Sequence, residues 1–167
     1  MSVFLRKLRS FASYTIKHAP YTVIVGLLLA SVVSWCGDYA KLAVILVVGN
    51  LLCQATKVCL RSVFGEECTK RPKCVHRLER GGDFFVKETS GMPSGHSFTM
   101  FLFAALITLY IYRRGNLPRT AVTAVVVFLL AVVVSVQRVR ENYHTHAQVV
   151  VGAVFGALSG AIAVRLV

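Results

Sequence analysis

Two short polar clusters interrupt the apolar stretches of this chain, and each places a histidine beside groups suited to binding phosphate. The first cluster is Gly91–His96 and the second is Arg138–His146. Each lies where an apolar helix is expected to meet the aqueous boundary. Ionisable groups that close to a membrane segment are costly and tend to serve function. We therefore interpret the clusters as parts of one phosphate site served by two histidines.

Cleavage of a phosphate ester or anhydride requires cations that hold the phosphoryl oxygens, a nucleophile in line and an acid for the leaving oxygen. His96 is expected in the first turn of a helix that begins near Ser94, where it can act as the acid. His144 lies one helical turn before Gln148, whose amide oxygen can accept the imidazole Nδ1–H. Nε2 of His144 is then free to attack, as in a catalytic triad with an amide in place of the carboxylate.

Cations and a helix N-terminus are predicted to hold the phosphate. Arg71 and Arg138 carry guanidinium groups, which match phosphate oxygens bidentately, and a lysine is expected beside them. The backbone N–H groups of Ser94 and Gly95, with the Ser94 hydroxyl, open the third apolar helix and favour an anion there. We predict no metal ion and no cofactor.

Long uncharged helices must position these groups. Of the 167 residues, 56% are hydrophobic and 16% are charged, against roughly 25% charged in an ordinary soluble domain. The polar helix faces that a soluble bundle needs are almost absent. The predicted fold class is therefore all-α, a polytopic transmembrane helix bundle. About five membrane-spanning helices of the ~17–25 residues that a bilayer requires are expected at 20–37, 41–60, 95–112, 120–137 and 145–165.

The remaining segments are a basic N-terminus and one long polar loop. Residues 1–18 combine cations with apolar side chains, which is typical of an amphipathic helix on a membrane surface. A basic flank that only orients the first span fits this pattern equally well. Residues 19–167 are expected to form one membrane-embedded domain, whose polar loop covers 61–90.

Five spans place both histidine clusters on one side of the membrane. The N-terminus, the polar loop and the Arg138–His144 segment share that side, and the third helix begins there with Pro93–His96. The Gly37–Ala40 turn, the Arg113–Arg119 turn and the C-terminus share the other side. A single active site needs this common side.

The motifs resemble those of the type-2 phosphatidic acid phosphatase superfamily. That family's pattern is K-x6-R-P, then P-S-G-H, then S-R-x5-H-x3-D. Here Arg71-Pro72, Pro93–His96 and Arg138 with His144 follow in the same order, alternating with helices. The resemblance covers roughly Leu51 to the C-terminus.

The resemblance also implies a role for each matching residue. His144 would form a phosphohistidine, and His96 would protonate the leaving group, with Gln148 as the partner of His144. The positions that would hold the phosphate are Lys57, Arg71, Ser94, Gly95 and Arg138.

Two departures concern the cations. Lys57 precedes Arg71 by more than the family spacing, so Arg61 and Lys70 are alternative candidates for the lysine role. Lys57 is favoured because it is expected to end a helix. Gln137 stands where the family has a serine before its arginine.

A third departure concerns the partner of the nucleophile. Gln148 stands where the superfamily usually has aspartate, and a neutral amide stabilises an imidazolium less than a carboxylate does. Together with Tyr143–Thr145 and Gly91–Ser94, however, this glutamine resembles the dolichyl diphosphatase branch. That resemblance implies a long-chain polyprenyl diphosphate as the substrate.

The sequence thus predicts an integral membrane phosphatase that converts a polyprenyl, dolichyl-type diphosphate to the monophosphate. The alternatives are a phosphatidate-type lipid phosphatase and a catalytically silent membrane protein that binds anionic lipid. The net charge of +12 favours membrane headgroups as partners, since the basic and aromatic surface of a nucleic-acid-binding protein is missing.

The side of the membrane that carries the site stays open. Basic N-terminal residues favour the cytoplasm, whereas the dolichyl diphosphatase resemblance implies the lumen of the endoplasmic reticulum. A disulfide between Cys68 and Cys74 would support the lumen.

Overall fold

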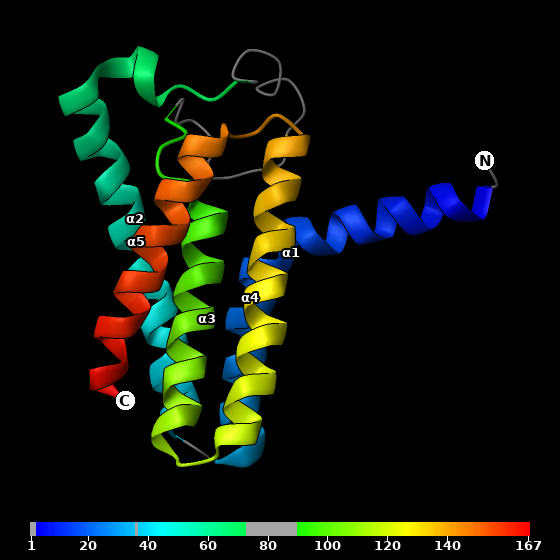
Figure 1. Ribbon diagram of the computed structural model, residues 1–167, viewed down its shortest axis with the longest axis vertical. Coiled ribbons are helices and arrows are strands. Elements are labelled where there is room, and N and C mark those ends of the chain that lie inside the picture. The colour runs from blue at the N-terminus through cyan, green and yellow to red at the C-terminus, as the bar shows by residue number, and fades with distance from the viewer. Residues whose placement is uncertain (1–2, 36, 73–89) are drawn as a thin grey trace.

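The computed structural model describes residues 3–35, 37–72 and 90–167, which form five α-helices and no named strand (Figure 1). This confirms the predicted all-α bundle. The elements are α1 (Val3–Ser34), α2 (Gly37–Thr69), α3 (Gly95–Arg113), α4 (Leu117–Arg140), α5 (His146–Ala163) and a final 3-10 turn, η1 (Val164–Leu166).

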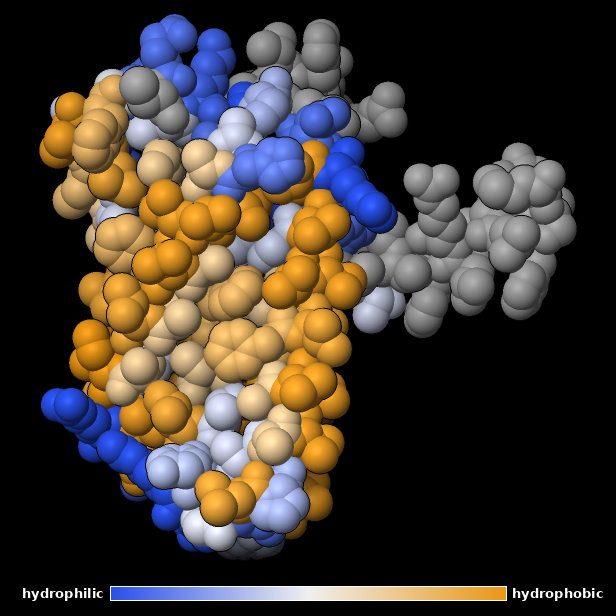
Figure 2. Space-filling view, in the orientation of Figure 1, coloured by the Kyte–Doolittle hydropathy of each residue, from blue (hydrophilic) through white to orange (hydrophobic). Residues whose placement is uncertain are grey.

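Four segments are long and apolar enough to cross a membrane: Gly37–Glu67, Gly95–Arg113, Leu117–Arg140 and His146–Leu166. The apolar part of α1, His18–Ser34, is shorter and lies near the lower limit of ~17 residues. Figure 2 shows an apolar belt across the middle of the face in view and hydrophilic residues at both ends. On α4, Val125 and Leu129 are exposed, which suits lipid rather than water. These features fit an integral multi-pass membrane protein.

Helix α2 is longer than the sequence predicts. The sequence predicts that the polar loop begins at residue 61, but α2 continues to Thr69. A charged residue ends a membrane span without ending a helix, because a helix that leaves the bilayer keeps its own hydrogen bonds. Lys57 therefore lies inside α2 and does not end it. At Gly65 the backbone takes φ 78° and ψ 169°, a conformation that is essentially restricted to glycine, and the helix changes direction there.

Helix α1 joins two segments that the sequence treats separately. It runs without a break from Val3 to Ser34, with Pro20 inside it. In Figure 1 the N-terminal half of α1 extends away from the bundle, and its C-terminal half packs within it. The first predicted span and the basic segment before it are thus parts of one helix.

Helix α3 lies at the centre, and its closest neighbour is α5. A Cβ atom on Gly152 would lie 2.6 Å from the carbonyl oxygen of Ser94, and one on Gly160 would lie 2.6 Å from that of Leu102. Only glycine permits backbones to approach so closely. As a result, the first residues of α3 and α5 touch: Ser94 N–H donates to the Gln148 carbonyl at 3.0 Å.

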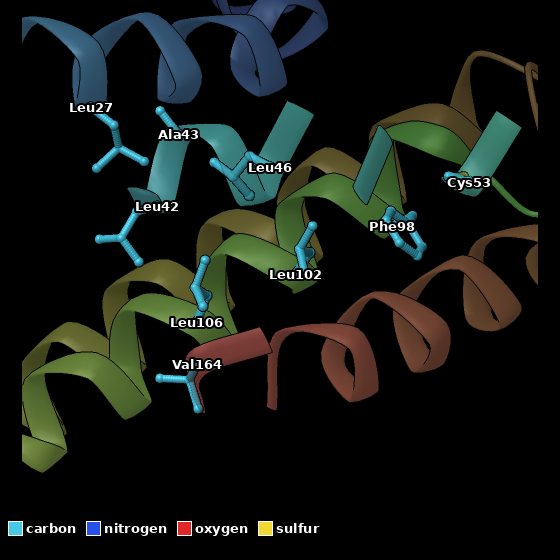
Figure 3. Packing of buried hydrophobic residues seen from close by; sticks show 9 residues of the cluster. All are labelled: Leu27, Leu42, Ala43, Leu46, Cys53, Phe98, Leu102, Leu106 and Val164. Atoms are coloured by element: carbon cyan, nitrogen blue, oxygen red, sulfur yellow. The ribbon is translucent and has the colours of Figure 1, made fainter. Parts of the chain in front are cut away.

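A buried apolar cluster joins α2 and α3. Leu42 and Leu46 of α2 meet Leu102 and Leu106 of α3, with Val164 of η1 beside them (Figure 3). This packing fixes α2 against α3, whose other end carries the first polar cluster.

Candidate active site

Four helix ends meet at one end of the bundle: the end of α2, the start of α3, the end of α4 and the start of α5 (Figure 1). Both histidine clusters therefore lie at the same end. The turns from α1 to α2 and from α3 to α4 lie at the opposite end.

His144 lies in the turn between α4 and α5 and is only 3% exposed. Its backbone N–H donates to the Arg138 carbonyl at 3.3 Å, and its Nδ1 is 3.2 Å from Oε1 of Gln148. Burial, together with the positive charges of Arg71, Arg138 and Lys57, lowers the pKa of His144 to about 3, although the Gln148 contact acts in the opposite direction. The imidazole is therefore neutral at physiological pH.

Gln148 is 2% exposed, and its neighbours decide which way its amide points. Nε2 donates to the Lys70 carbonyl at 2.9 Å and to the Thr69 carbonyl at 3.4 Å. Carbonyl oxygens only accept, so the NH2 group must face them and Oε1 must face His144. The backbone N–H of Thr145 also donates to Oε1, at 3.2 Å. Nδ1 of His144 therefore carries the proton, and the Nε2 lone pair is free.

Of the three candidates for the lysine role, Lys57 of α2 is the one whose side chain reaches the start of α3. Its side chain is buried, and Nζ is 3.5 Å from the position that a Cβ on Gly95 would occupy. Arg61 is paired with Glu66, and 41% of its side chain is exposed. Lys70 is exposed. The Lys57 side chain reaches the start of α3 because residue 57 faces inward on α2, and not because the helix ends there.

The two arginines approach from different elements. Arg71 follows α2 and is half-buried; its Nε donates to the Ser90 carbonyl at 3.4 Å. Arg138, in the last turn of α4, is buried, and its guanidinium lies 4.2 Å from the centre of the Tyr143 ring. Both raise the positive potential around His144.

The start of α3 has an unusual N-cap. Ser94 occupies the N-cap position, but its side chain caps no backbone N–H. Its hydroxyl instead accepts a hydrogen bond from Ser97 at 3.2 Å, and Ser97 accepts one from Ser135 of α4 at 3.0 Å. The first N–H groups of α3 are thus left without a side-chain cap, as an anion site at a helix N-terminus requires. His96 lies in this first turn and is half-buried.

Sequence reasoning missed three structural contributors. Ser97 and Ser135 stand in apolar runs, and only the register of α3 against α4 brings them together. In the sequence, Gly91 stands out only as part of the first polar cluster. A Cβ there would lie 2.6 Å from Gln148 Oε1 and 2.8 Å from Arg71 Cγ, so the close approach of these groups requires glycine.

Two features raised by the sequence lie outside the described residues: the pairing of Cys68 with Cys74, which the sequence leaves open, and most of the polar loop. Within residues 3–35, 37–72 and 90–167, no group of three His, Cys, Asp or Glu side chains could hold a metal ion.

An open cavity of about 490 Å³ lies at the opposite end of the bundle, lined in part by Tyr39, Tyr110, Arg114 and Arg119. Arg114 is already engaged there by Asp38 and by the Tyr110 hydroxyl. The cavity contains no histidine and none of the motif residues. We therefore place the site at the histidine end, on chemical grounds.

Comparison with known proteins gives the same assignment as the motifs. Residues 38–167 match the PAP2 superfamily. The chain is also similar to dolichyldiphosphatase 1 of Dictyostelium discoideum, with 38% identity over 80 residues, which is 46% of this chain and 35% of that protein. The chain thus matches about a third of the length of this curated relative, and no solved structure matches it. Because the superfamily match covers most of the sequence, the chain belongs to the PAP2 superfamily.

Proposed function

We propose that this protein is an integral membrane lipid phosphatase that hydrolyses a polyprenyl, dolichyl-type diphosphate to the monophosphate. The observation that carries the proposal is the environment of His144: a buried, neutral imidazole with Nδ1 beside Oε1 of Gln148 and three cations nearby. A nucleophile needs the free lone pair, and a transferring phosphoryl group needs the cations.

The proposed reaction has two steps. Nε2 of His144 attacks the terminal phosphorus, the bond from phosphorus to the bridging oxygen breaks, and His96 gives its proton to that oxygen. Water then attacks the phosphohistidine and passes a proton to His96 as the nitrogen–phosphorus bond breaks. Inorganic phosphate leaves, and both histidines return to their initial states. Lys57, Arg71, Arg138, Ser94 and Gly95 would hold the phosphoryl oxygens.

Three observations support the choice of substrate. The chain is similar to a protein named dolichyldiphosphatase 1, and Gln148 matches the residue expected of that branch. The apolar surface around the helices would accommodate the lipid tail beside the polar end (Figure 2). In a eukaryotic cell, we propose the endoplasmic reticulum membrane as the location.

The test is phosphate release in detergent from a polyprenyl diphosphate and from phosphatidate, for wild type and His144→Ala. We expect the diphosphate to be preferred and the alanine variant to be inactive. Equal release by the two proteins would overturn the enzyme assignment. Preference for phosphatidate would replace the substrate class, and lipid binding without turnover by the wild type would establish the silent alternative.

A further inference from the structure

We infer that Gln148 is a positioning residue with a second role, in which its amide NH2 holds the phosphate-binding Arg71 segment against the nucleophile. This inference rests on the proposed function and assigns a role to the half of the side chain that does not face His144. The amide oxygen orients the imidazole, and the amide nitrogen fixes the backbone immediately before Arg71.

The contacts of the NH2 group define the segment that it holds. Nε2 donates to the carbonyls of Lys70 and Thr69, at 2.9 and 3.4 Å. The Thr69 carbonyl also accepts from Gly91 N–H at 2.6 Å, and Lys70 forms an isolated antiparallel bridge with Ser90. Thr69–Arg71 and Ser90–Gly91 therefore form a short antiparallel pair beside the Gln148 side chain.

Besides its bonds to Gln148, the segment makes hydrogen bonds within α2 and to Ser90. Thr69 ends α2 four residues after the change of direction at Gly65, and its hydroxyl donates to the carbonyls of Gly65 and Glu66 at 3.0 and 3.4 Å. The contacts to Ser90–Gly91 join the Arg71 segment to another segment outside the helices. Gln148, in the first turn of α5, links the pair to the bundle, and its own carbonyl accepts from Ser94 N–H at 3.0 Å. One residue thus ties the Arg71 segment, the start of α3 and His144 together.

A carboxylate at position 148 could perform only the orienting role. It offers Nδ1 of His144 a stronger acceptor than an amide does. It has no N–H to donate, however, and would place negative charge beside two carbonyl oxygens. Aspartate is also one methylene shorter.

The two roles predict opposite outcomes for Gln148→Glu. If orienting His144 were the only role, the variant would equal or exceed the wild type. If the NH2 group holds the Arg71 segment, the variant binds phosphate more weakly even though His144 keeps its acceptor. We expect KM for polyprenyl diphosphate and the inhibition constant of inorganic phosphate to rise about tenfold, as for the loss of one or two hydrogen bonds, with a smaller change in kcat.

Asn50→Asp is the matched control. Asn50 Nδ2 donates to the Leu46 carbonyl at 3.0 Å, and its Oδ1 accepts from Thr99 at 2.8 Å. The substitution therefore also places a carboxylate against a backbone carbonyl, but within the helix bundle. Its phosphate inhibition constant should match that of the wild type, so a general effect of a partly buried carboxylate is separated from the effect at position 148.

The experiment uses full-length protein in detergent, with the melting temperature recorded for each variant. Phosphate binding is measured twice, by product inhibition and by the rise in melting temperature that inorganic phosphate produces. Wild-type phosphate affinity in Gln148→Glu would overturn the inference and leave the proposed function intact. If the wild type binds phosphate but hydrolyses no lipid, the proposed function fails, and the thermal measurement still tests the contact.

Gly91→Ala provides a second variant if Gln148→Glu does not fold. An added Cβ would displace Gln148 Oε1 and Arg71, so the same rise in the phosphate inhibition constant is expected. A folded Gly91→Ala protein with wild-type phosphate affinity would contradict the inference.

Discussion

At the scale of single residues, the site depends on side chains whose hydrogen-bond partners leave them one orientation. Gln148 cannot turn its amide over, because two carbonyl oxygens face its nitrogen. His144 consequently keeps its proton on Nδ1. The spacing of four residues predicted that these two side chains would meet as neighbours on one helix face. The structure brings them together with His144 in the turn before the N-cap, Thr145. The partners on the far side of Gln148 come from the end of α2 and the residue after it, about eighty positions earlier, and no local pattern indicates them.

The depressed pKa of His144 predicts a pH dependence of stability. The imidazole titrates near 6.5 when unfolded and at about 3 when folded, so between these values the unfolded chain binds more protons. The contribution of His144 to the free energy of unfolding is fully present above pH 6.5. It is lost as the pH falls toward 3, at up to about 1.4 kcal/mol per pH unit.

The measurement is the melting temperature in detergent between pH 7 and pH 5. We expect the wild type to lose more than His144→Asn over this range, because the remaining titratable groups are common to both proteins. Parallel curves for the two proteins would show that His144 is not buried in its neutral form.

The hydrogen-bonded serine chain Ser135, Ser97 and Ser94 predicts an effect on catalysis from residues that need not touch the substrate. Ser97→Ala would free the Ser94 hydroxyl to return to its capping position, where it competes with phosphate for the N–H groups of α3. Ser135→Ala would weaken the same arrangement from α4. Each should lower kcat/KM about two- to tenfold, the effect of one hydrogen bond.

Thr108→Val is the control for this prediction. It removes a hydroxyl from α3 whose Oγ1 has no hydrogen-bond partner among the described residues. Its kcat/KM should therefore remain at the wild-type value. If kcat/KM falls similarly in all three variants, the serine substitutions act through packing and not through their hydrogen bonds.

At the scale of elements, uncharged runs predicted the helices well but their ends poorly. The bilayer sets the length of a span, so the runs that became α3, α4 and α5 were found within a few residues. Helix α2 continues past Arg61 to Thr69 because charge ends burial in lipid and not helical hydrogen bonding. The change of direction at Gly65 was also missed, since a single glycine in a charged stretch equally marks a loop. The position of Arg71 beside Gln148 depends on that turn.

Gly65 accordingly predicts a functional effect of a small substitution. Alanine at φ 78° and ψ 169° is strained by about 1–3 kcal/mol, and relief of this strain would move Thr69–Arg71 away from Gln148. We expect Gly65→Ala to raise the inhibition constant of inorganic phosphate clearly, with only a small fall in the melting temperature.

Gly26→Ala is the matched control for Gly65→Ala. Gly26 is helical within α1, and no atom lies within 4 Å of its added Cβ, so alanine there should be neutral or stabilising by up to about 1 kcal/mol. If the phosphate inhibition constant of Gly65→Ala equals that of the wild type, the change of direction at Gly65 does not influence phosphate binding.

At the scale of the whole molecule, the bundle has two chemically different ends. One end gathers the histidines and the cations around His144, and the other carries Arg114 in an ion pair with Asp38. Between them lies the apolar belt of Figure 2. The order of helices, rather than any single contact, brings segments from residue 57 to residue 148 to one end. The order of the helices could therefore be read from sequence, whereas the contacts within that end could not.

The last prediction follows from this separation and concerns which positions share a side of the membrane. In a cysteine-free background, Glu67→Cys and Arg140→Cys each place a thiol at an exposed position of the histidine end. Arg119→Cys places one at an exposed position of the opposite end. In sealed vesicles of one orientation, an impermeant thiol reagent should label the first two together and spare the third, or the reverse. Because the helices keep their order whichever way the protein is inserted, this pattern holds for either orientation. Labelling of Arg119→Cys together with Glu67→Cys would mean that α3 does not cross the membrane, and the shared site would lose its structural basis.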